Sequence, residues 1–245
     1  MEPILDVAGL RKRYGVKTVV DDVSFSAWKG ECVGIIGPNG AGKTTLFNLL
    51  DGTTRADGGK VVLGGVDITT RPQFYRARQG VGRAYQVPRP FAGLTVFENV
   101  LVGAIHDATL EHSAARRRAM EIVETVGPAG KKDQPAGRLT LLDRKRLELA
   151  KAMSIGARVL LLDEIAGGLT EGEVQQLVEL VVALKADHAV LWIEHIAHAL
   201  VSAADRIMVL HFGAKLMEGR PVEVMAAPVV QEVYLGIAVD DTPRG

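Results

Sequence analysis

Hydrophobic runs separated by glycine, proline and polar residues recur along the chain, and this pattern predicts strands alternating with helices. The runs with strand character are VSFSAW, CVGII, KVVLGG, RVLLLD, AVLWI and RIMVL. CVGII, RVLLLD and AVLWI are apolar at almost every position, so we expect both of their faces to be buried. Strands of that kind are typical of a parallel sheet covered by helices, and the pattern therefore predicts an α/β fold.

The clearest helical pattern begins after Thr170. Its apolar residues, Val174, Leu177, Val178 and Val181, have the i, i+3, i+4, i+7 spacing of an amphipathic helix. Thr170 and Glu173 have the spacing of a capping box, so we expect the helix to begin there. Thr95 and Glu98 repeat this spacing in TVFENVLVGA and predict a second helix start.

The order of these elements predicts one domain with a helical insertion. From about residue 87 to residue 156 the pattern is mostly helical and contains no strong strand. We therefore expect a single domain over residues 1–245, with a core of about 1–86 and 157–245 and a helical sub-domain of about 87–156. A chain of 245 residues is long enough to bury a sizeable core in such an arrangement.

Composition narrows the classes of partner. Lys plus Arg and Asp plus Glu number 29 each, so the charge balance does not indicate a nucleic-acid partner. We expect the basic run Arg116–Arg118 to be a solvated helix face, and the single cysteine, Cys32, to be buried in a protein of a reducing compartment. The start of the sequence lacks the pattern of a secretory signal, and no apolar run approaches the roughly 18–20 residues that span a bilayer. Any membrane part is thus expected on another chain.

The strongest chemical signal is GPNGAGKTT, which lies between the strand CVGII and the helical LFNLL. It has the pattern G-x-x-x-x-G-K-[ST] in strand–loop–helix order, which predicts a phosphate-binding loop and a P-loop NTPase (RecA-like) core. The predicted nucleotide-binding residues are Gly37, Pro38, Asn39, Gly40, Ala41, Gly42, Lys43, Thr44 and Thr45. Backbone N–H groups and the helix start attract phosphate oxygens. We expect Lys43 to reach the β- and γ-phosphates and the Thr44 hydroxyl to bind Mg²⁺.

A strand that ends in a carboxylate usually accompanies such a loop, and RVLLLDE provides one. We expect Asp163 to hold Mg²⁺ through a water molecule. Glu164 follows directly at the edge of the predicted sheet, where a second carboxylate can accept a proton from an attacking water molecule. The two residues are therefore candidates for metal binding and for general-base catalysis.

With these motifs in this order, the chain resembles the ATP-hydrolysing subunits of ABC transporters along nearly its whole length, and most of all those of branched-chain amino acid importers. The resemblance implies that Tyr14 in KRYG stacks on adenine. It implies that Gln86 in GRAYQ contacts Mg²⁺ and the attacking water, and that His195 in LWIEHIAHAL contacts the γ-phosphate. His195 and His198 also have a spacing that can bind a metal, but no third ligand with a recognisable spacing accompanies them.

The stretch LTLLDRKRLELAKA occupies the position of the family's signature motif, whose helix start binds the γ-phosphate of ATP held by a second subunit. The corresponding residues are Thr140, Leu141, Leu142 and Asp143. Leucines replace the family's glycines, so the close approach of the backbone is lost. We expect Asp143 to turn back to the N–H groups of the helix, and Arg144, Lys145 and Arg146 to offset its charge.

Further departures from the family's pattern also fall outside the phosphate loop. Ile165 stands where the family usually has proline, and GGLT replaces the usual aspartate or asparagine ending, so that Thr170 is expected to serve as a helix cap. Ala84 and Tyr85 replace the usual residues before the glutamine. We therefore expect the residues that bind ATP within this chain to support hydrolysis. The residues that would contact ATP held by a second subunit are expected to be altered.

The resemblance implies a small antiparallel β part beside the core, ATP and Mg²⁺ as cofactors, and a place on the cytoplasmic face of the cell membrane. It implies three kinds of partner: a second ATP-binding subunit, transmembrane permease subunits that contact about residues 87–100, and an extracytoplasmic solute-binding protein. It implies uptake of branched-chain or related amino acids or amides. The solute, the choice between homodimer and heterodimer, and the effect of the altered signature on hydrolysis stay open.

Three alternatives remain beside this interpretation. A soluble ABC-type ATPase of DNA repair or translation usually carries long coiled-coil insertions or two ATPase domains, neither of which the pattern predicts. The second alternative is a GTPase or a small-molecule kinase; a GTPase usually carries N-K-x-D, and no asparagine here precedes a lysine. A regulatory subunit that binds ATP without hydrolysing it is compatible with the altered signature. An ATPase assay with and without membrane partners distinguishes the last alternative.

Overall fold

The computed structural model describes residues 2–106 and 111–235; residues 1, 107–110 and 236–245, which belong to the predicted domain, lie outside the described part. The strands are β1 (Leu5–Tyr14), β2 (Lys17–Ala27), β3 (Cys32–Ile36), β4 (Gly58–Leu63), β5 (Val66–Asp67), β6 (Val81–Ala84), β7 (Val159–Asp163), β8 (Ala189–Ile193), β9 (Arg206–His211) and β10 (Ala214–Gly219). The helices are α1 (Lys43–Asp51), α2 (Gln73–Arg78), α3 (Val96–Ile105), α4 (His112–Thr125), α5 (Leu141–Ser154), α6 (Glu171–Leu184), α7 (Ala197–Ala203), α8 (Pro221–Ala226) and α9 (Pro228–Leu235), with short 3-10 turns η1 (Ala129–Lys131) and η2 (Ala136–Arg138).

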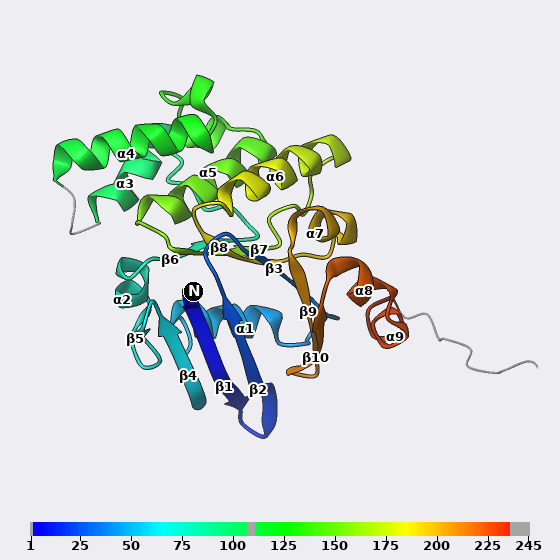
Figure 1. Cartoon of the computed structure of the whole chain (residues 1–245). Coiled ribbons are helices and arrows are strands. Elements are labelled where there is room, and N and C mark those ends of the chain that lie inside the picture. Colours follow the sequence, from blue (N-terminus) through cyan, green and yellow to red (C-terminus); the bar gives the residue numbers. More distant parts are fainter. Residues whose placement is uncertain (1, 107–110, 236–245) are drawn as a thin grey trace, which may run out of the picture.

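The larger sheet has the strand order β10-β9-β3-β8-β7-β6. Its strands are parallel except for β10, which pairs antiparallel with β9 at one edge. The apolar runs CVGII, AVLWI and RVLLLD form β3, β8 and β7, which lie side by side in the middle of the sheet (Figure 1). The prediction of an α/β fold with a parallel sheet is confirmed.

A second sheet and helix α1 cover one face of the larger sheet (Figure 1). This sheet is antiparallel and has the order β2-β1-β4-β5, so the expected antiparallel β part is present. Leu161 of β7 and Leu191 of β8 belong to one core cluster with Leu46 and Phe47 of α1. Because α1 is packed between the two sheets, the end of the phosphate loop that leads into α1 is held in place.

Helices cover the opposite face of the larger sheet. Leu160 and Trp192, which alternate with the residues facing α1, belong to a second core cluster with residues of α5 and α6. The stripe predicted for α6 is buried, and it comprises Val174, Leu177, Val178 and Val181. The predicted helix starts are confirmed, because the carboxylate of Glu173 accepts from the Thr170 N–H at 2.9 Å and that of Glu98 accepts from the Thr95 N–H at 2.7 Å.

Between residues 87 and 156 the described chain forms α3, α4, α5 and the two 3-10 turns. An isolated bridge between Thr95 and Pro135 is the sole β pairing in this part of the described residues. Figure 1 shows these helices stacked on one side of the larger sheet. We retain the division into a core and a helical sub-domain as a proposal.

Two structurally important strands have no clear sequence pattern. In β1 the apolar residues alternate only at first, and Gly9 and a run of basic residues interrupt the pattern. In β6 the sequence VGRA is short and includes Arg83. Both strands pair with strands that lie far away in the sequence. Local periodicity contains no information about such pairing.

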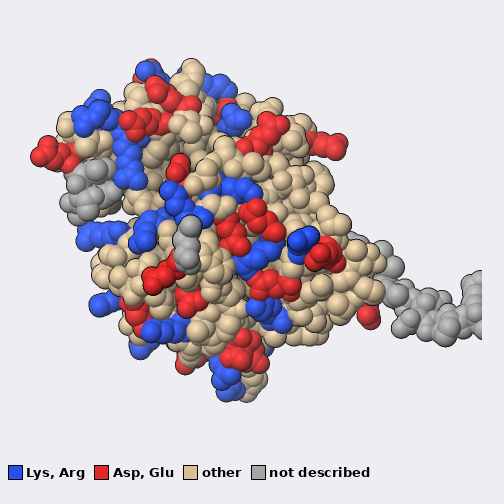
Figure 2. Space-filling model, in the orientation of Figure 1, with Lys and Arg blue, Asp and Glu red and all other residues tan. Residues whose placement is uncertain are grey.

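The mixed charges of the surface and the burial of the single cysteine agree with what the composition led us to expect. Figure 2 shows acidic and basic side chains interspersed over the face that it displays. Cys32 is buried, and burial together with the charge of Asp205 raises the pKa of its thiol to about 12. Among the helices of residues 2–106 and 111–235, none combines the length and apolar character needed to cross a bilayer.

Candidate functional site

The carboxyl ends of neighbouring strands bring most of the predicted site residues to one edge of the larger sheet. Strand β3 leads directly into the loop that contains Gly37–Thr45. Its neighbour β8 ends two residues before His195, and the next strand, β7, ends at Asp163. Parallel strands of an open α/β sheet end at the same edge, which is where such folds bind their ligands.

The phosphate loop requires glycine at two positions for steric reasons. A Cβ atom on Gly37 would lie 2.2 Å from the carbonyl oxygen of Leu210. Gly42 has a φ of +101°, and a Cβ atom there would lie 2.4 Å from the carbonyl oxygen of Val19. The loop is therefore pressed against two strands, which supports the narrow turn in which backbone N–H groups can surround phosphate oxygens.

Lys43 lies at the start of α1, immediately after this turn. Its Nζ donates to the carbonyl oxygens of Gly37 at 2.6 Å and Pro38 at 3.1 Å. Burial lowers the pKa of Lys43, and the charges of Glu164 and Asp163 oppose that shift. The ammonium group is thus held over the loop, where a phosphate group would offer stronger acceptors than two carbonyl oxygens.

Glu164 lies between Gln86 and His195. The Gln86 amide Nε2 donates to Glu164 Oε2 at 2.6 Å, and His195 Nε2 lies 2.7 Å from Glu164 Oε1. These residues are 78 and 31 positions from Glu164 in the sequence, so the fold alone brings them together. A carboxylate flanked by an amide and an imidazole can orient a water molecule and accept its proton.

The backbone around Glu164 is unusual and firmly held. Glu164 has a φ of +47°, which is rare for a residue other than glycine and is typical of functional sites. Its N–H donates to the carbonyl oxygen of Ile193 at 2.8 Å. Glu194, which is 1% exposed, accepts from the N–H groups of Ala166 at 3.0 Å and His195 at 2.9 Å. These bonds connect the loop after β7 to the loop after β8.

Asp163 has a partner that the sequence did not reveal. Arg83 of β6 donates from Nη2 to Asp163 Oδ2 at 2.5 Å. Its Nη1 donates to Asp51 Oδ2 and to Asn48 Oδ1, both at 2.7 Å. The side chain of Arg83 is only 6% exposed. Arg83 therefore connects the strand that ends at Asp163 to the end of α1. The sequence feature that could have indicated this role is a charged residue within the short strand VGRA.

The candidate Mg²⁺ ligands offer hard oxygen donors. Thr44 is exposed at the start of α1, Asp163 ends β7, and Gln86 follows β6. A hydroxyl, a carboxylate and an amide oxygen are groups that Mg²⁺ accepts together with water and phosphate oxygens. The donor set beside a glycine-rich phosphate loop therefore fits a magnesium–nucleotide complex.

Tyr14 ends β1 and is 50% exposed. It pairs in register with Lys17, at the turn of the hairpin that continues to Val19 beside Gly42. Lys12 Nζ lies 5.3 Å from the centre of the ring. An exposed ring at this place is available for stacking on a base, the role that we predict for it.

Thr140–Asp143 form the start of α5. Among the described residues, no hydrogen bond or ion pair joins this segment to Gly37–Thr45. The Thr140 hydroxyl donates to Asp143 Oδ2 at 2.9 Å, and its oxygen accepts from the Asp143 N–H at 3.3 Å. The expectation for Asp143 was wrong: its carboxylate binds Lys131 and the Thr140 hydroxyl instead of helix N–H groups, because a cation from η1 lies within reach.

Arg144, Lys145 and Arg146, which we expected to offset the charge of Asp143, make their hydrogen bonds with other residues. Arg144 donates to the Gly137 carbonyl oxygen and Arg146 to Gln176 Oε1. Lys145, which is 3% exposed, donates to the Gln86 carbonyl oxygen.

The same face of α5 holds the segment after β6 at further points. Glu148 accepts from the Arg89 N–H at 3.2 Å, and Lys151 donates to the Arg89 carbonyl oxygen at 2.8 Å. Burial lowers the pKa of Lys145, while the charges of Glu194, Glu164 and Glu148 oppose that shift. The helix that begins at Thr140 is thereby connected to the segment that carries Gln86.

Comparisons with known proteins agree with this geometry. A family model described as "ABC transporter" matches residues 20–167. The high-affinity branched-chain amino acid transport ATP-binding protein BraF of Pseudomonas aeruginosa is 36% identical over 96% of this chain and 99% of its own length. Its counterpart LivG of Salmonella typhimurium is 36% identical over 97% and 99%. The crystal structure of an ATP-binding cassette of an ABC transporter in its ADP conformation superimposes with a TM-score of 0.87 at 30% identity, over 97% of this chain and 100% of that one.

Proposed function

The chain belongs to the ABC transporter family and is an ATPase, and from that premise we propose that it powers an importer of branched-chain or related amino acids or amides. The observation that carries the ATPase role is the position of Glu164 between Gln86 and His195, beside the phosphate loop. The solute class rests on the similarity to BraF and LivG over nearly the full length of each chain. We place the chain on the cytoplasmic face of the membrane, bound to permease subunits that work with an extracytoplasmic solute-binding protein.

In the proposed mechanism Gly37–Thr45 bind the phosphates of ATP and Tyr14 stacks on the base. Thr44, Gln86 and Asp163 would hold Mg²⁺, which would supply positive charge to the phosphates. Glu164 accepts the proton of the attacking water, while His195 orients the γ-phosphate. Donors that are already in position contribute to catalysis without reorganisation.

We infer that a second ATP-binding subunit completes the site through Thr140–Asp143 of its own α5. Leu141 is 42% exposed at the start of the helix, as a surface that faces a partner requires. The Asp143 N–H donates to the Thr140 hydroxyl, so the positive dipole end of the helix and the N–H groups before Asp143 are the features that would attract a phosphate group. The closed pair is favoured by bound ATP and released after hydrolysis, which supplies the conformational cycle.

Replacing Leu141 by glutamate is expected to lower ATP turnover of the assembled transporter about fivefold, since a carboxylate there repels the phosphate of the facing site. Turnover by the assembled transporter is the measurement. Val182→Glu is a matched control, because Val182 is 40% exposed on α6. Equal rates for wild type and both variants would remove the start of α5 from the site, whereas ATP binding without turnover in the wild-type assembly would favour a regulatory subunit.

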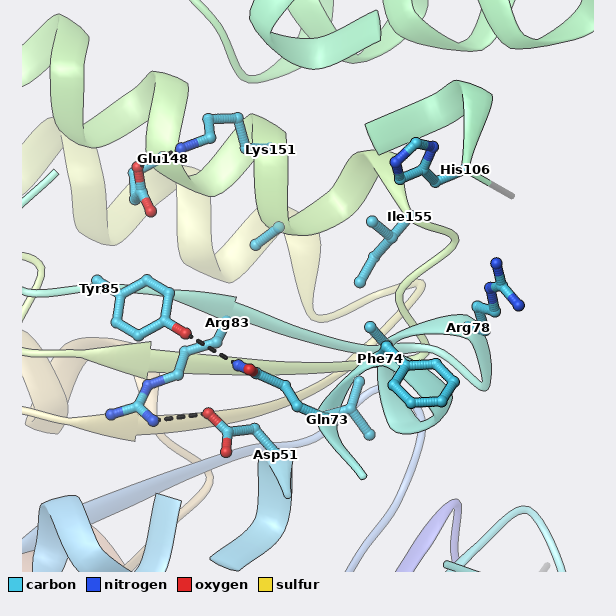
Figure 3. Close-up of a pocket in the computed structure, with 13 residues that line it drawn as sticks. Asp51, Gln73, Phe74, Arg78, Arg83, Tyr85, His106, Glu148, Lys151 and Ile155 are labelled. Atoms are coloured by element: carbon cyan, nitrogen blue, oxygen red, sulfur yellow. Dashed lines mark hydrogen bonds and ion pairs between the residues drawn. The ribbon is translucent and has the colours of Figure 1, made fainter. Parts of the chain in front are cut away.

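We propose that the permease binds at a groove of about 460 Å³. No residue of the expected contact segment, about 87–100, is among those that line the groove, but Glu148 and Lys151 in its lining contact Arg89 of that segment. Figure 3 shows Glu148 and Lys151 of α5 on one side of the groove, Arg83 and Tyr85 below them, and Phe74 of α2 at one end. Phe74 is 65% exposed and offers an apolar anchor, while the contacts between α5 and Arg89 connect the groove to Gln86. A permease segment seated there would move Gln86 relative to Glu164.

Phe74→Asp is expected to weaken binding to the permease about tenfold, because it places a charge in the apolar anchor position of an interface. The measurement is the amount of chain that binds to inverted membrane vesicles containing the permease. Basal ATP hydrolysis by the isolated chain should stay unchanged. Val222→Asp on α8, where Val222 is 72% exposed, is the control. Equal binding of both variants would contradict the placement.

The solute assignment is tested by reconstitution. The chain would be purified from solubilised membranes with its bound partners, and the complex placed in vesicles with ATP inside. We expect ATP-dependent accumulation of radiolabelled leucine or a related amino acid. ATP hydrolysis without transport of any amino acid or amide would contradict the proposed importer but not the ATPase.

A further inference from the structure

The last described helix, α9, contacts the loop that carries His195. The Tyr234 hydroxyl donates a hydrogen bond to the backbone carbonyl oxygen of His195 at 2.9 Å. The two residues are 39 positions apart, so the contact depends on how α9 packs against the core. The proposed mechanism gives Tyr234 no role, although its hydroxyl is a direct contact of a predicted catalytic residue.

The backbone of His195 is held from both sides. Its N–H donates to Glu194 Oε1 at 2.9 Å, and the other oxygen of this buried carboxylate accepts from the Ala166 N–H. Its carbonyl oxygen accepts from Tyr234. Because N–H and C=O are both held, the direction of the Cα–Cβ bond of His195 is set, and in this arrangement its Nε2 lies 2.7 Å from Glu164 Oε1.

Helix α9 holds the tyrosine in place. Val230, one turn before Tyr234, is 1% exposed, and the ring of Tyr234 packs against the same core cluster as Val230. Figure 1 shows α8 and α9 following β10 at the edge of the larger sheet. Pro228 begins α9, at a position that suits proline because the first helical N–H has no partner in the helix. The ring therefore packs independently of its hydroxyl.

We propose that Tyr234 is a positioning residue for ATP hydrolysis, which holds the backbone of His195 so that its imidazole faces Glu164 and the phosphate loop. The proposal rests on the proposed function and extends it to the C-terminal helix. Burial and the charges of Glu194 and Glu164 raise the pKa of Tyr234, so the hydroxyl is a donor at neutral pH. Loss of one hydrogen bond of this kind changes a rate by about two- to tenfold.

Tyr234→Phe tests the proposal, because it removes the hydroxyl and keeps the ring in the core. We expect kcat for ATP hydrolysis to fall by about two- to tenfold, with little change in the KM for magnesium–ATP or in the midpoint of thermal unfolding. Tyr75→Phe is the matched control, since Tyr75 is also partly buried but lies on α2. That control should keep the wild-type kcat.

Two readouts separate positioning from a merely structural role. In the His195→Ala background, Tyr234→Phe should cause no further loss of kcat, because its effect acts through the imidazole. In the nucleotide-free chain it should accelerate amide hydrogen exchange over residues 194–200. An equal loss in both backgrounds, an unchanged kcat or unchanged exchange would each overturn the proposal. A wild-type chain without ATP turnover would contradict the proposed function instead, and the exchange measurement would still decide the role of Tyr234.

Discussion

Replacing Glu164 by glutamine is expected to lower the rate of ATP hydrolysis by about 10²–10⁴-fold, the usual cost of losing a general base. Glutamine has nearly the same shape, so the contacts that place this side chain between Gln86 and His195 can largely persist. An amide, unlike a carboxylate, does not take a proton from water at neutral pH. Single-turnover hydrolysis of radiolabelled ATP measures the effect.

Binding of ATP should survive this change, and the pair of subunits should be trapped in its ATP-bound form. Size-exclusion chromatography with magnesium–ATP would then detect a stable dimer of the Glu164→Gln variant. Glu171→Gln is the matched control, because Glu171 is exposed in the first turn of α6 and should leave turnover unchanged. Normal hydrolysis by the Glu164 variant would show that another group accepts the proton.

Replacing Arg83 by methionine is expected to destabilise the chain by about 3–5 kcal/mol, the usual result of removing one partner of a buried ion pair. The side chains of Asp51 and Asp163 are 4% and 9% exposed, and they would be left facing each other without the guanidinium. Methionine fills a similar volume, so the loss reports charge more than packing. Equilibrium unfolding in urea, read as the free energy extrapolated to water, measures it.

Two further variants sharpen this experiment. Arg78→Met changes an exposed arginine of α2 and should alter the free energy of unfolding by less than about 0.5 kcal/mol. Arg83→Lys keeps the charge but not the planar fork that reaches Asp51 and Asp163 together, and we expect an intermediate loss. If Arg83→Met and wild type had the same free energy of unfolding, the ion pairs of Arg83 with Asp51 and Asp163 would make no net contribution to stability.

The core of the fold could be predicted from the chain because its signals are local. The runs that form β3, β7 and β8 are apolar on both faces, which is compatible only with strands covered on both sides. The capping boxes at Thr95 and Thr170 depend on residues three positions apart. The phosphate loop is likewise contained in nine consecutive residues, from Gly37 to Thr45.

The partners of the charged residues could not be predicted in this way. We expected the arginines and the lysine of the signature-like stretch to offset the charge of Asp143, but the cation that forms an ion pair with it is Lys131 of η1. Lys145 instead reaches Gln86, 59 positions away. Which long side chains meet depends on how η1, α5 and the end of β6 pack, and that packing is fixed by apolar contacts elsewhere.

The sequence by itself therefore determined the type of fold, the phosphate loop and the order of the motifs, since each depends on the spacing of neighbouring residues. Only the tertiary structure decided that Arg83 binds Asp163 and that Tyr234 binds His195. The physical reason is that hydrogen bonds between distant segments require a particular register of strands and a particular packing of helices. The identity of one residue does not indicate which strand or helix will lie beside it.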